Sequence, residues 1–290
     1  MTYAQAVKEA EAFLADHGIA DASVDAWLLF SFVTGVSRAM FLAERMQKMP
    51  EEQHQRYREL LEKRASHIPL QHLTGEQEFM GFSFLVNQHV LVPRQDTETL
   101  VETVLSYVKP GMRVLDLCTG SGCIAISMAK LCDGLQVDAA DISKEALAVA
   151  MENAARLEAN VTFWQGDLFA CHYLRGDTEK LPIAAYDCIV SNPPYIRTDV
   201  IKTLSEEVRL HEPYQALDGK ADGLYFYRRI ITEAHSYLTP GGHIFFEIGY
   251  DQGEAVKNLL LEDGYTEVEV RKDLAGLDRV VTGEYPGKNP

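Results

Sequence analysis

Residues 116–122 read Asp116-Leu117-Cys118-Thr119-Gly120-Ser121-Gly122, a turn with two glycines between a predicted strand and a predicted helix. Glycine lets a ligand come close to the backbone, and such a turn lies at the carboxyl edge of a sheet, where open α/β sheets bind ligands. Gly120, Gly122 and Ala125 also satisfy the dinucleotide-binding pattern G-x-G-x-x-G/A. The turn therefore predicts an α/β fold with a nucleotide-like ligand, and a purely structural tight turn is the alternative.

Strands and helices are predicted to alternate after Pro110, as a parallel sheet with helices on both faces requires. The predicted strands are 113–117, 136–140, 161–165, 186–191, 243–248, 266–270 and 278–284, and the predicted helices are 122–132, 144–156, 222–238 and 251–261. Only Asp273–Leu277 separates the last two strands, which is too short for a helical crossover, so we expect an antiparallel pair. Seven strands with a reversed last strand are the architecture of Rossmann-like methyltransferases.

The amino-terminal part of the chain has helical periodicity. The predicted helices have apolar stripes at Val7, Ala10, Phe13 and Leu14, and at Val24, Trp27, Leu28 and Phe32, followed by helices at 37–46 and at 51–65, the last with Tyr57, Leu60 and Leu61 inward. Such a bundle either recruits a partner or covers a neighbouring domain, and periodicity does not choose between these roles.

Residues 69–93 change character, because apolar residues there are punctuated by Gly75, Gly81 and Asn87, which predicts short strands in a hairpin. We therefore expect an α/β protein in three parts. Residues 1–68 form a helical bundle, 69–93 a β-hairpin linker, and 94–290 a Rossmann-like domain with seven strands.

Composition restricts the class of protein. The 290 residues suggest roughly two domains, and the net charge of −16 argues against a broad surface for phosphate backbones. The five cysteines form no C-x-x-C pair and indicate reduced core residues in a cytosolic protein. We expect no signal peptide and no membrane span, because the longest apolar stretch, from Ala26 to Val33, is short. The nine histidines have no ligand spacing, so no metal site is expected.

Two acidic residues follow strands at the predicted ligand edge. Asp141 lies 19 positions after Gly122, close to the offset of about 20 at which an acid meets ribose hydroxyls, although a helix N-cap is the alternative role. We place the adjacent Ile142 in the same site. Asp167 is positioned to meet an adenine edge, with Leu168 or Phe169 on the ring face, or else these are a turn acid and core residues. Both NAD and S-adenosyl-L-methionine fit this set.

The tetrapeptide Asn192-Pro193-Pro194-Tyr195 follows the predicted strand at 186–191. Two prolines leave the asparagine little freedom, so its side-chain oxygen and the neighbouring carbonyls suit gripping an NH2 group, although Asn and Pro are also common turn residues. In the usual strand order this turn faces the part of the ligand beyond the glycine turn. A methyl group on a sulfonium would lie there, so the tetrapeptide favours S-adenosyl-L-methionine over NAD.

With these features the chain resembles the HemK/PrmC family, the glutamine-N5 methyltransferases of peptide chain release factors. The likeness covers nearly the whole chain and includes Pro69–Gly75, Glu78-Phe79, Val92-Pro93-Arg94, Asp96-Thr97-Glu98, Val114–Gly122, Ser191–Ile196, Glu212-Pro213, Ala216-Leu217 and Asp222-Gly223-Leu224. Family members often have Gly at the position of Cys118 and Pro at that of Gln95. Some relatives stack a Trp on adenine where this chain has Leu168.

The resemblance implies S-adenosyl-L-methionine as cofactor, S-adenosyl-L-homocysteine as product, and the glutamine of the Gly-Gly-Gln motif of class I release factors as acceptor. The residues it implies are Asn192, Pro193, Pro194 and Tyr195 for catalysis, and Asp116, Cys118, Thr119, Gly120, Ser121, Gly122, Asp141, Ile142, Asp167, Leu168 and Asn192 for the cofactor. The helical part and the hairpin would recognise the release factor, in the cytoplasm and without direct contact to nucleic acid.

Two other functions remain open at this point. Adenine-N6 nucleic-acid methyltransferases share the Asn-Pro-Pro-Tyr type of motif, but such an enzyme needs a basic channel or a recognition domain, which the charge of −16 does not favour. A non-catalytic protein that retains the fold should have lost the glycine turn or Asn192, and both are present.

Overall fold

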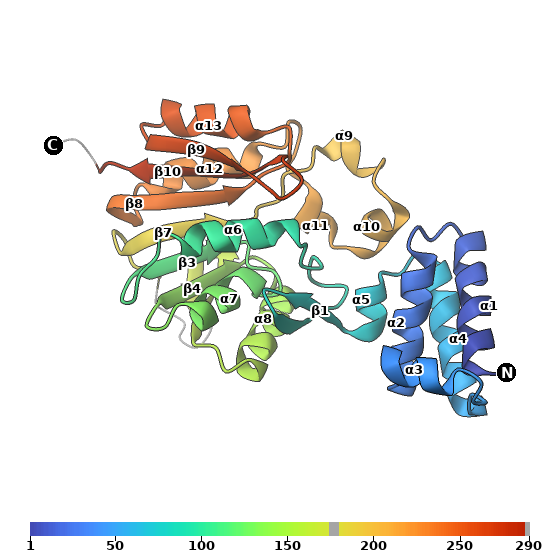
Figure 1. Cartoon of the computed structure of the whole chain (residues 1–290). Coiled ribbons are helices and arrows are strands. Elements are labelled where there is room, and N and C mark those ends of the chain that lie inside the picture. The colour runs from blue at the N-terminus through green and yellow to red at the C-terminus, as the bar shows by residue number, and fades with distance from the viewer. Residues whose placement is uncertain (174–179, 288–290) are drawn as a thin grey trace. The chain divides into compact units, whose positions relative to one another are not determined.

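The computed structural model describes residues 1–173 and 180–287, which divide into two compact units (Figure 1). Unit 1 consists of Met1–Glu76 and Ser205–His211, and unit 2 of Gln77–Leu204 and Glu212–Pro290. The elements are α1 (Tyr3–Asp16), α2 (Ala22–Thr34), α3 (Arg38–Glu44), α4 (Glu51–Ala65), α5 (Leu70–Thr74), β1 (Glu76–Phe79), β2 (Phe82–Leu85), α6 (Asp96–Leu105), β3 (Arg113–Leu117), α7 (Cys123–Leu131), β4 (Gln136–Asp141), α8 (Lys144–Arg156), β5 (Val161–Asp167), β6 (Ala170–Tyr173), β7 (Tyr186–Ser191), α9 (Thr198–Ile201), α10 (Glu206–His211), α11 (Tyr214–Leu217), α12 (Tyr225–Ala234), β8 (Leu238–Glu247), α13 (Gly253–Glu262), β9 (Thr266–Lys272) and β10 (Asp278–Tyr285).

Unit 1 is helical, and one of its predicted faces is wrong. In α2 the side chains of Val24, Leu28 and Phe32 are 48%, 41% and 41% exposed, whereas Leu29 and Phe30 are fully buried; Trp27 of the predicted stripe is buried as expected. The helix is apolar nearly all the way round, so periodicity does not indicate which face turns inward. Polar contacts of Asp25 and Ala26 select the inward face.

An ion-pair network fixes the inward face of α2. Arg64 on α4 places its Nε 2.7 Å from a carboxylate oxygen of Asp25, and its Nη2 lies 2.8 Å from Glu207. The hydroxyl of Tyr57 donates to the carbonyl of Ala26 at 2.7 Å. Burial raises the pKa of Asp25, and Arg64 opposes that rise. The contact with Glu207 explains why α10, from the second half of the sequence, belongs to unit 1.

The predicted linker contains both a helix and a hairpin. Residues Leu70–Thr74, expected to be extended, form α5, which follows Pro69 and ends at Gly75 in the left-handed region with φ 83°. The strands β1 and β2 pair as a two-stranded sheet. The division between the units falls after Glu76, inside the range expected for the linker.

Unit 2 contains a mixed sheet in the order β6-β5-β4-β3-β7-β8-β10-β9. Strands β3, β4, β5, β7 and β8 are parallel, and β10 is antiparallel to both β8 and β9. The Rossmann-like fold with its reversed last strand is therefore confirmed. The structure adds β6, which pairs antiparallel with β5, and the short helices α9, α10 and α11, which the sequence patterns did not predict.

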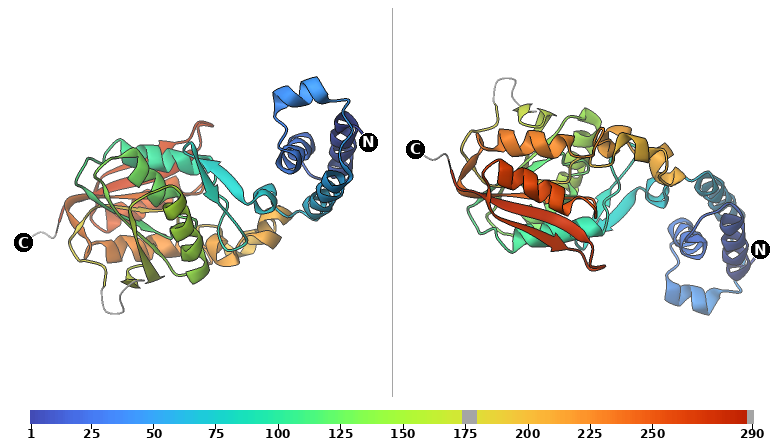
Figure 2. Two further views of the ribbon diagram at one scale, coloured as in Figure 1. Left: turned by 90° about the horizontal axis from the view of Figure 1, so that it is seen from below. Right: turned by 90° about the horizontal axis from the view of Figure 1, so that it is seen from above.

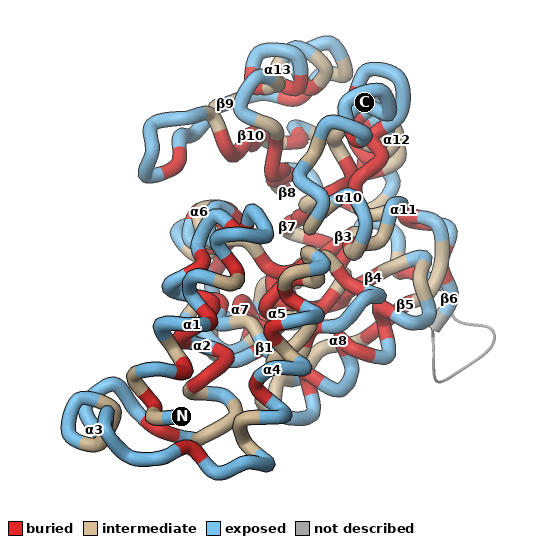
Figure 3. The backbone as a smooth tube through the Cα atoms, turned by 90° about the vertical axis from the view of Figure 1, so that its right-hand side faces the viewer, coloured by how far each residue is buried: buried red, intermediate tan, exposed pale blue. Residues whose placement is uncertain are grey.

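Helices cover both faces of this sheet (Figure 2). Buried residues of α6, α7 and α8 pack on one face, and those of α12 and α13 on the other. The central strands are accordingly mostly buried (Figure 3). Within the described residues no single helix has the length and apolarity to cross a bilayer; α2 and α3 pass that test only as a pair, across an 85° bend.

We predict that Arg64→Ala destabilises the protein by about 3–5 kcal/mol, because it leaves the buried Asp25 carboxylate without its counter-charge. Denaturant unfolding measures the change. Arg58→Ala is the matched control on the same helix, because its ion pair with Glu62 is exposed and contributes about 0–1 kcal/mol. Equal losses for the two variants would contradict the role given to Arg64.

Candidate active site

Strand register brings distant parts of the chain together at one edge of the sheet. Leu117, at the end of β3, pairs with Ala140 of β4 and with Ser191 of β7, and Ser191 in turn pairs with Phe246 of β8. A cavity of about 320 Å³ lies at this edge, and all of its lining residues belong to unit 2. The predicted residues in its wall are Cys118, Thr119, Gly120, Ser121, Asp141, Ile142, Asp167, Leu168, Asn192 and Pro194. Four other predicted residues lie outside the lining, namely Asp116, Gly122, Pro193 and Tyr195.

The two glycines of the turn have different reasons to be glycine. Gly120 has φ 55°, and a Cβ there would meet no atom within 4 Å, so the space next to its backbone is open to a ligand. Gly122 has φ 80°, and a Cβ there would lie 2.9 Å from Ile126 and 3.1 Å from Ala150. Gly122 is therefore required for packing of α7 against α8, and Gly120 leaves room in the cavity wall.

Asp141 ties the glycine turn to the next strand. Its Oδ2 accepts from the backbone N–H of Gly120 at 2.9 Å, and its Oδ1 accepts from that of Ser143 at 2.9 Å. The N-cap of α8 is Ser143, whose hydroxyl accepts from Ala146, so Asp141 is not that cap. Burial raises the pKa of Asp141. The carboxylate thus orders the turn and also faces the cavity, beside Ile142.

Asp116 lies beneath the turn. It is fully buried, and its Oδ2 accepts from the Thr119 hydroxyl at 2.6 Å, while its Oδ1 has no hydrogen-bond partner. Burial raises its pKa to about 7. Its position shapes the turn from below, whereas Cys118, at φ 62°, reaches the cavity wall.

Of the residues expected around an adenine ring, one apolar side chain lines the cavity and the other packs elsewhere. Leu168 lines the cavity, whereas Phe169 stacks on Tyr237 with ring centroids 4.4 Å apart. The carboxylate of Asp167 is engaged by Arg229, at 2.9 and 3.0 Å from one guanidinium nitrogen. Leu168 is therefore better placed than Phe169 to contact a ligand.

The Asn-Pro-Pro-Tyr turn meets a polar group that the sequence reasoning missed. Asn192 Nδ2 donates to the Thr97 hydroxyl at 3.4 Å, and the Tyr195 hydroxyl donates to Glu247 at 3.3 Å. Burial raises the pKa of Tyr195, and it raises that of Glu247 to about 7. The hydroxyl of Tyr195 is thus directed at this buried carboxylate, and the expectation that Tyr195 lies against a substrate amide stays a prediction.

Signals for some of the missed residues were present in the sequence. Glu247 is a lone acid at the end of an apolar strand, and Thr97 lies inside a segment that carried the family resemblance. Arg94, from the neighbouring segment Val92-Pro93-Arg94, lines the cavity and pairs with Glu212 at 2.5 Å. The short segment Pro213–Ala216 also lines the cavity; Pro213 and Ala216 belong to motifs that carried the family resemblance, but no role was assigned to them.

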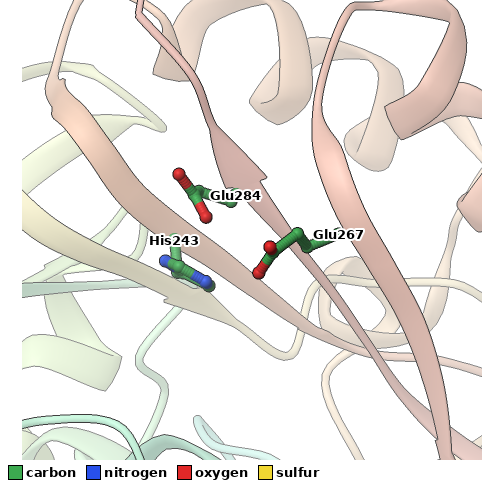
Figure 4. Close-up of side chains that lie close together, drawn as sticks. All are labelled: His243, Glu267 and Glu284. Carbon is green, nitrogen blue, oxygen red and sulfur yellow. The ribbon is translucent and has the colours of Figure 1, made fainter.

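One cluster elsewhere in unit 2 has metal-ligand residue types (Figure 4). His243 of β8, Glu267 of β9 and Glu284 of β10 place possible ligand atoms within 4.8 Å of one another. The ring of His243 packs against that of Tyr107 in a tilted arrangement, with centroids 4.1 Å apart, and its Nδ1 lies 3.2 Å from the Gly241 carbonyl. These contacts account for the position of His243, and the cluster lies outside the cavity, so we assign it no part in the function.

A parallel sheet with a reversed last strand, an open glycine turn and an asparagine beyond it define a Rossmann-like methyltransferase that uses S-adenosyl-L-methionine. Residues 5–75 match the family model for the PrmC N-terminal domain, and residues 95–210 match that for the methyltransferase small domain. The chain is 40% identical over 271 residues to the release factor glutamine methyltransferase of Geobacter sulfurreducens, covering 93% of this chain and 92% of that one. It belongs to the family of release factor glutamine methyltransferases.

Two further comparisons agree. The release factor glutamine methyltransferase of Caulobacter vibrioides is 41% identical over 296 residues, which cover 100% of this chain and 98% of that one. A crystal structure of a methyltransferase from Pyrococcus furiosus superimposes with a TM-score of 0.51 at 20% identity, over 72% of this chain and 90% of that one. The second likeness concerns the fold alone.

We predict that Gly120→Val abolishes binding of S-adenosyl-L-methionine and leaves the fold largely intact, because the side chain fills the open space beside the turn. Calorimetry measures the affinity. Gly276→Val is the matched control, since Gly276 also has a positive φ of 79° and open space around it, in the β9–β10 turn. Both variants carry a backbone strain of about 1–2 kcal/mol, so only the cavity distinguishes them. Near-normal affinity in folded Gly120→Val protein would show that the turn is structural.

Proposed function

We propose that this protein transfers a methyl group from S-adenosyl-L-methionine to the side-chain amide nitrogen (N5) of the glutamine in the Gly-Gly-Gln motif of class I release factors. The observation that carries this proposal is the position of Asn192, which lines the same cavity as the open glycine turn. Family membership supports the acceptor, because the relatives are named for the glutamine of a release factor.

The residues of the cavity fit the cofactor. Gly120 leaves open space at the backbone, Asp141 offers a carboxylate for hydroxyl groups, and Leu168 offers an apolar surface for a ring. When bound, S-adenosyl-L-methionine supplies an electrophilic methyl group on a sulfonium and leaves as S-adenosyl-L-homocysteine. We assign Cys118, Thr119, Ser121, Ile142 and Asp167 to the same site because they line the cavity too. Asp116 and Gly122 support the turn from within.

Positioning carries the catalysis in this proposal. An amide nitrogen is a poor nucleophile, because its lone pair is delocalised into the carbonyl. Hydrogen bonds from the acceptor NH2 to the side-chain oxygen of Asn192 and to the carbonyl of Pro193 hold that nitrogen and favour positive charge on it. Pro194 limits the freedom of the turn. The proton leaves to water after transfer, so we assign no general base.

The charge of the chain favours a protein acceptor over nucleic acid. A net charge of −16 works against the clustered Lys and Arg on which affinity for phosphate backbones depends. We therefore expect no direct contact with nucleic acid. A cytoplasmic location follows from the acceptor, since translation termination takes place there.

We assign recognition of the release factor to the helical part and the hairpin. Unit 1 exposes large apolar side chains, among them Leu42 at 71% and Met46 at 72%. Contiguous exposed apolar patches are typical of protein contact sites. Together with the exposed face of α2, these residues supply a surface for a protein partner.

The experiment is methyl transfer from labelled S-adenosyl-L-methionine to a class I release factor. We expect label on the wild-type factor and none on a factor with Gln→Ala in its Gly-Gly-Gln motif. Adenine-containing duplex DNA serves as the second acceptor and should stay unlabelled. Label that persists on the Gln→Ala factor, or that appears on the DNA alone, would reject the proposed acceptor.

Asn192→Ala should lower the methyl-transfer rate by about 10²-fold or more, the scale seen when one well-placed polar group is removed from an active site. Cofactor affinity should change much less, because the glycine turn and Asp141 remain. Asn192→Asp keeps the shape and the acceptor oxygens, and should retain partial activity. Single-turnover rates with saturating cofactor and release factor isolate the chemical step, and a rate within about threefold of wild type for Asn192→Ala would refute the assigned role.

A further inference from the structure

A buried carboxylate lies next to the Asn-Pro-Pro-Tyr turn. Glu247 ends β8, and register places it there because Phe246, the residue before it, pairs with Ser191, the residue before Asn192. Glu247 is 2% exposed, and its Oε2 has no hydrogen-bond partner. A buried carboxylate with an unsatisfied oxygen is costly to the fold, so such a group points to a role other than stability.

The carboxylate is linked to both polar side chains of the turn. The Tyr195 hydroxyl donates directly to Oε1 of Glu247 at 3.3 Å. The Thr97 side chain lies close enough to the carboxylate to lower its pKa by hydrogen bonding, and the Thr97 hydroxyl oxygen accepts from Asn192 Nδ2 at 3.4 Å. Thr97 is itself buried, at 3% exposure, and lines the cavity.

The chemistry of these groups gives the chain of contacts a direction. In its ionised form, above the raised pKa of about 7, the Glu247 carboxylate only accepts hydrogen bonds, so the single proton of the Thr97 hydroxyl then points to Glu247. The lone pairs of that hydroxyl then face Asn192, which can only donate to them. Of the two ends of the Asn192 amide, the NH2 group is therefore held at Thr97 and the oxygen is left for the cavity. The flipped amide would place two acceptor oxygens against each other.

We propose that Glu247 and Thr97 are positioning residues that set the orientation of the Asn192 amide, so that its oxygen faces the acceptor nitrogen. Glu247 acts through Thr97 on Asn192 and acts directly on Tyr195, and it touches neither cofactor nor acceptor. This inference rests on the proposed function, because it assigns to Asn192 Oδ1 the grip on the glutamine NH2 group. The inference also explains which of the two nearly isosteric orientations the Asn192 amide adopts.

The test compares Thr97→Val, Thr97→Ser and Thr282→Val. Valine keeps the shape of threonine and removes the hydroxyl, serine keeps the hydroxyl, and Thr282 is a buried threonine of β10 whose hydroxyl has no partner. We expect the single-turnover rate of Thr97→Val to fall on the order of tenfold or more, as for a misplaced catalytic group. The dissociation constant of S-adenosyl-L-methionine should stay within about threefold. Thr97→Ser and Thr282→Val should react like wild type.

Glu247→Leu is the second variant, and it keeps the proposal testable if the Thr97→Val protein does not fold. Leucine removes the buried charge and also the acceptor of the Tyr195 hydroxyl, so the melting temperature is measured beside the rate, which should fall as in Thr97→Val. A wild-type rate in either variant overturns the proposal, as does a parallel loss of rate and cofactor affinity. If the wild-type protein does not methylate the release factor at all, the proposed function fails, and this inference fails with it; if the wild-type protein is active and the variants are unchanged, only this inference fails. The measured cofactor affinities and melting temperatures then still report whether the two residues serve stability.

Discussion

Parallel pairing in register is the constraint on which the rest of the site depends. The carboxyl ends of β3, β4, β7 and β8 meet at one edge because Leu117, Ala140, Ser191 and Phe246 occupy the same level of the sheet. The residue or turn that follows each of these positions contributes to the site or its support. Backbone hydrogen bonds hold that level, so groups far apart in the chain meet with little freedom to shift. A slip by one residue would turn every side chain to the opposite face.

Buried carboxylates in unit 2 divide into two kinds. Asp138, in the middle of β4, accepts from Arg113, Trp164 and Tyr186, at 2.8–3.0 Å. Such a satisfied network holds strands together. At the carboxyl edge the pattern differs, because Asp116 and Glu247 each keep one oxygen without a hydrogen-bond partner. Burial raises the pKa of both to about 7. Buried carboxylates with an unpaired oxygen and a raised pKa are typical of functional sites.

Unit 1 shows how a few polar contacts override periodicity. Several faces of α2 are similarly apolar, so burying any of them would gain a similar free energy. The hydrophobic effect alone therefore does not select one. The ion pair of Asp25 with Arg64 and the hydrogen bond from Tyr57 are directional, and they select the face that carries Leu29 and Phe30. The same guanidinium reaches Glu207, so α10 is assigned by contact rather than by its place in the sequence.

Sequence patterns were sufficient for the Rossmann-like fold, the antiparallel last strand and the chemical type of the site. Strand and helix periodicities are local properties, and the glycine turn and the Asn-Pro-Pro-Tyr turn each carry their chemistry within a few residues. The features that depend on contacts between strands were decided only by the tertiary structure. It separated Leu168 from Phe169, gave Asp141 two backbone partners in place of a cap, and put Glu247 and Thr97 behind Asn192. The identity of a residue states what it can donate or accept, but only the register of neighbouring strands determines which group it meets.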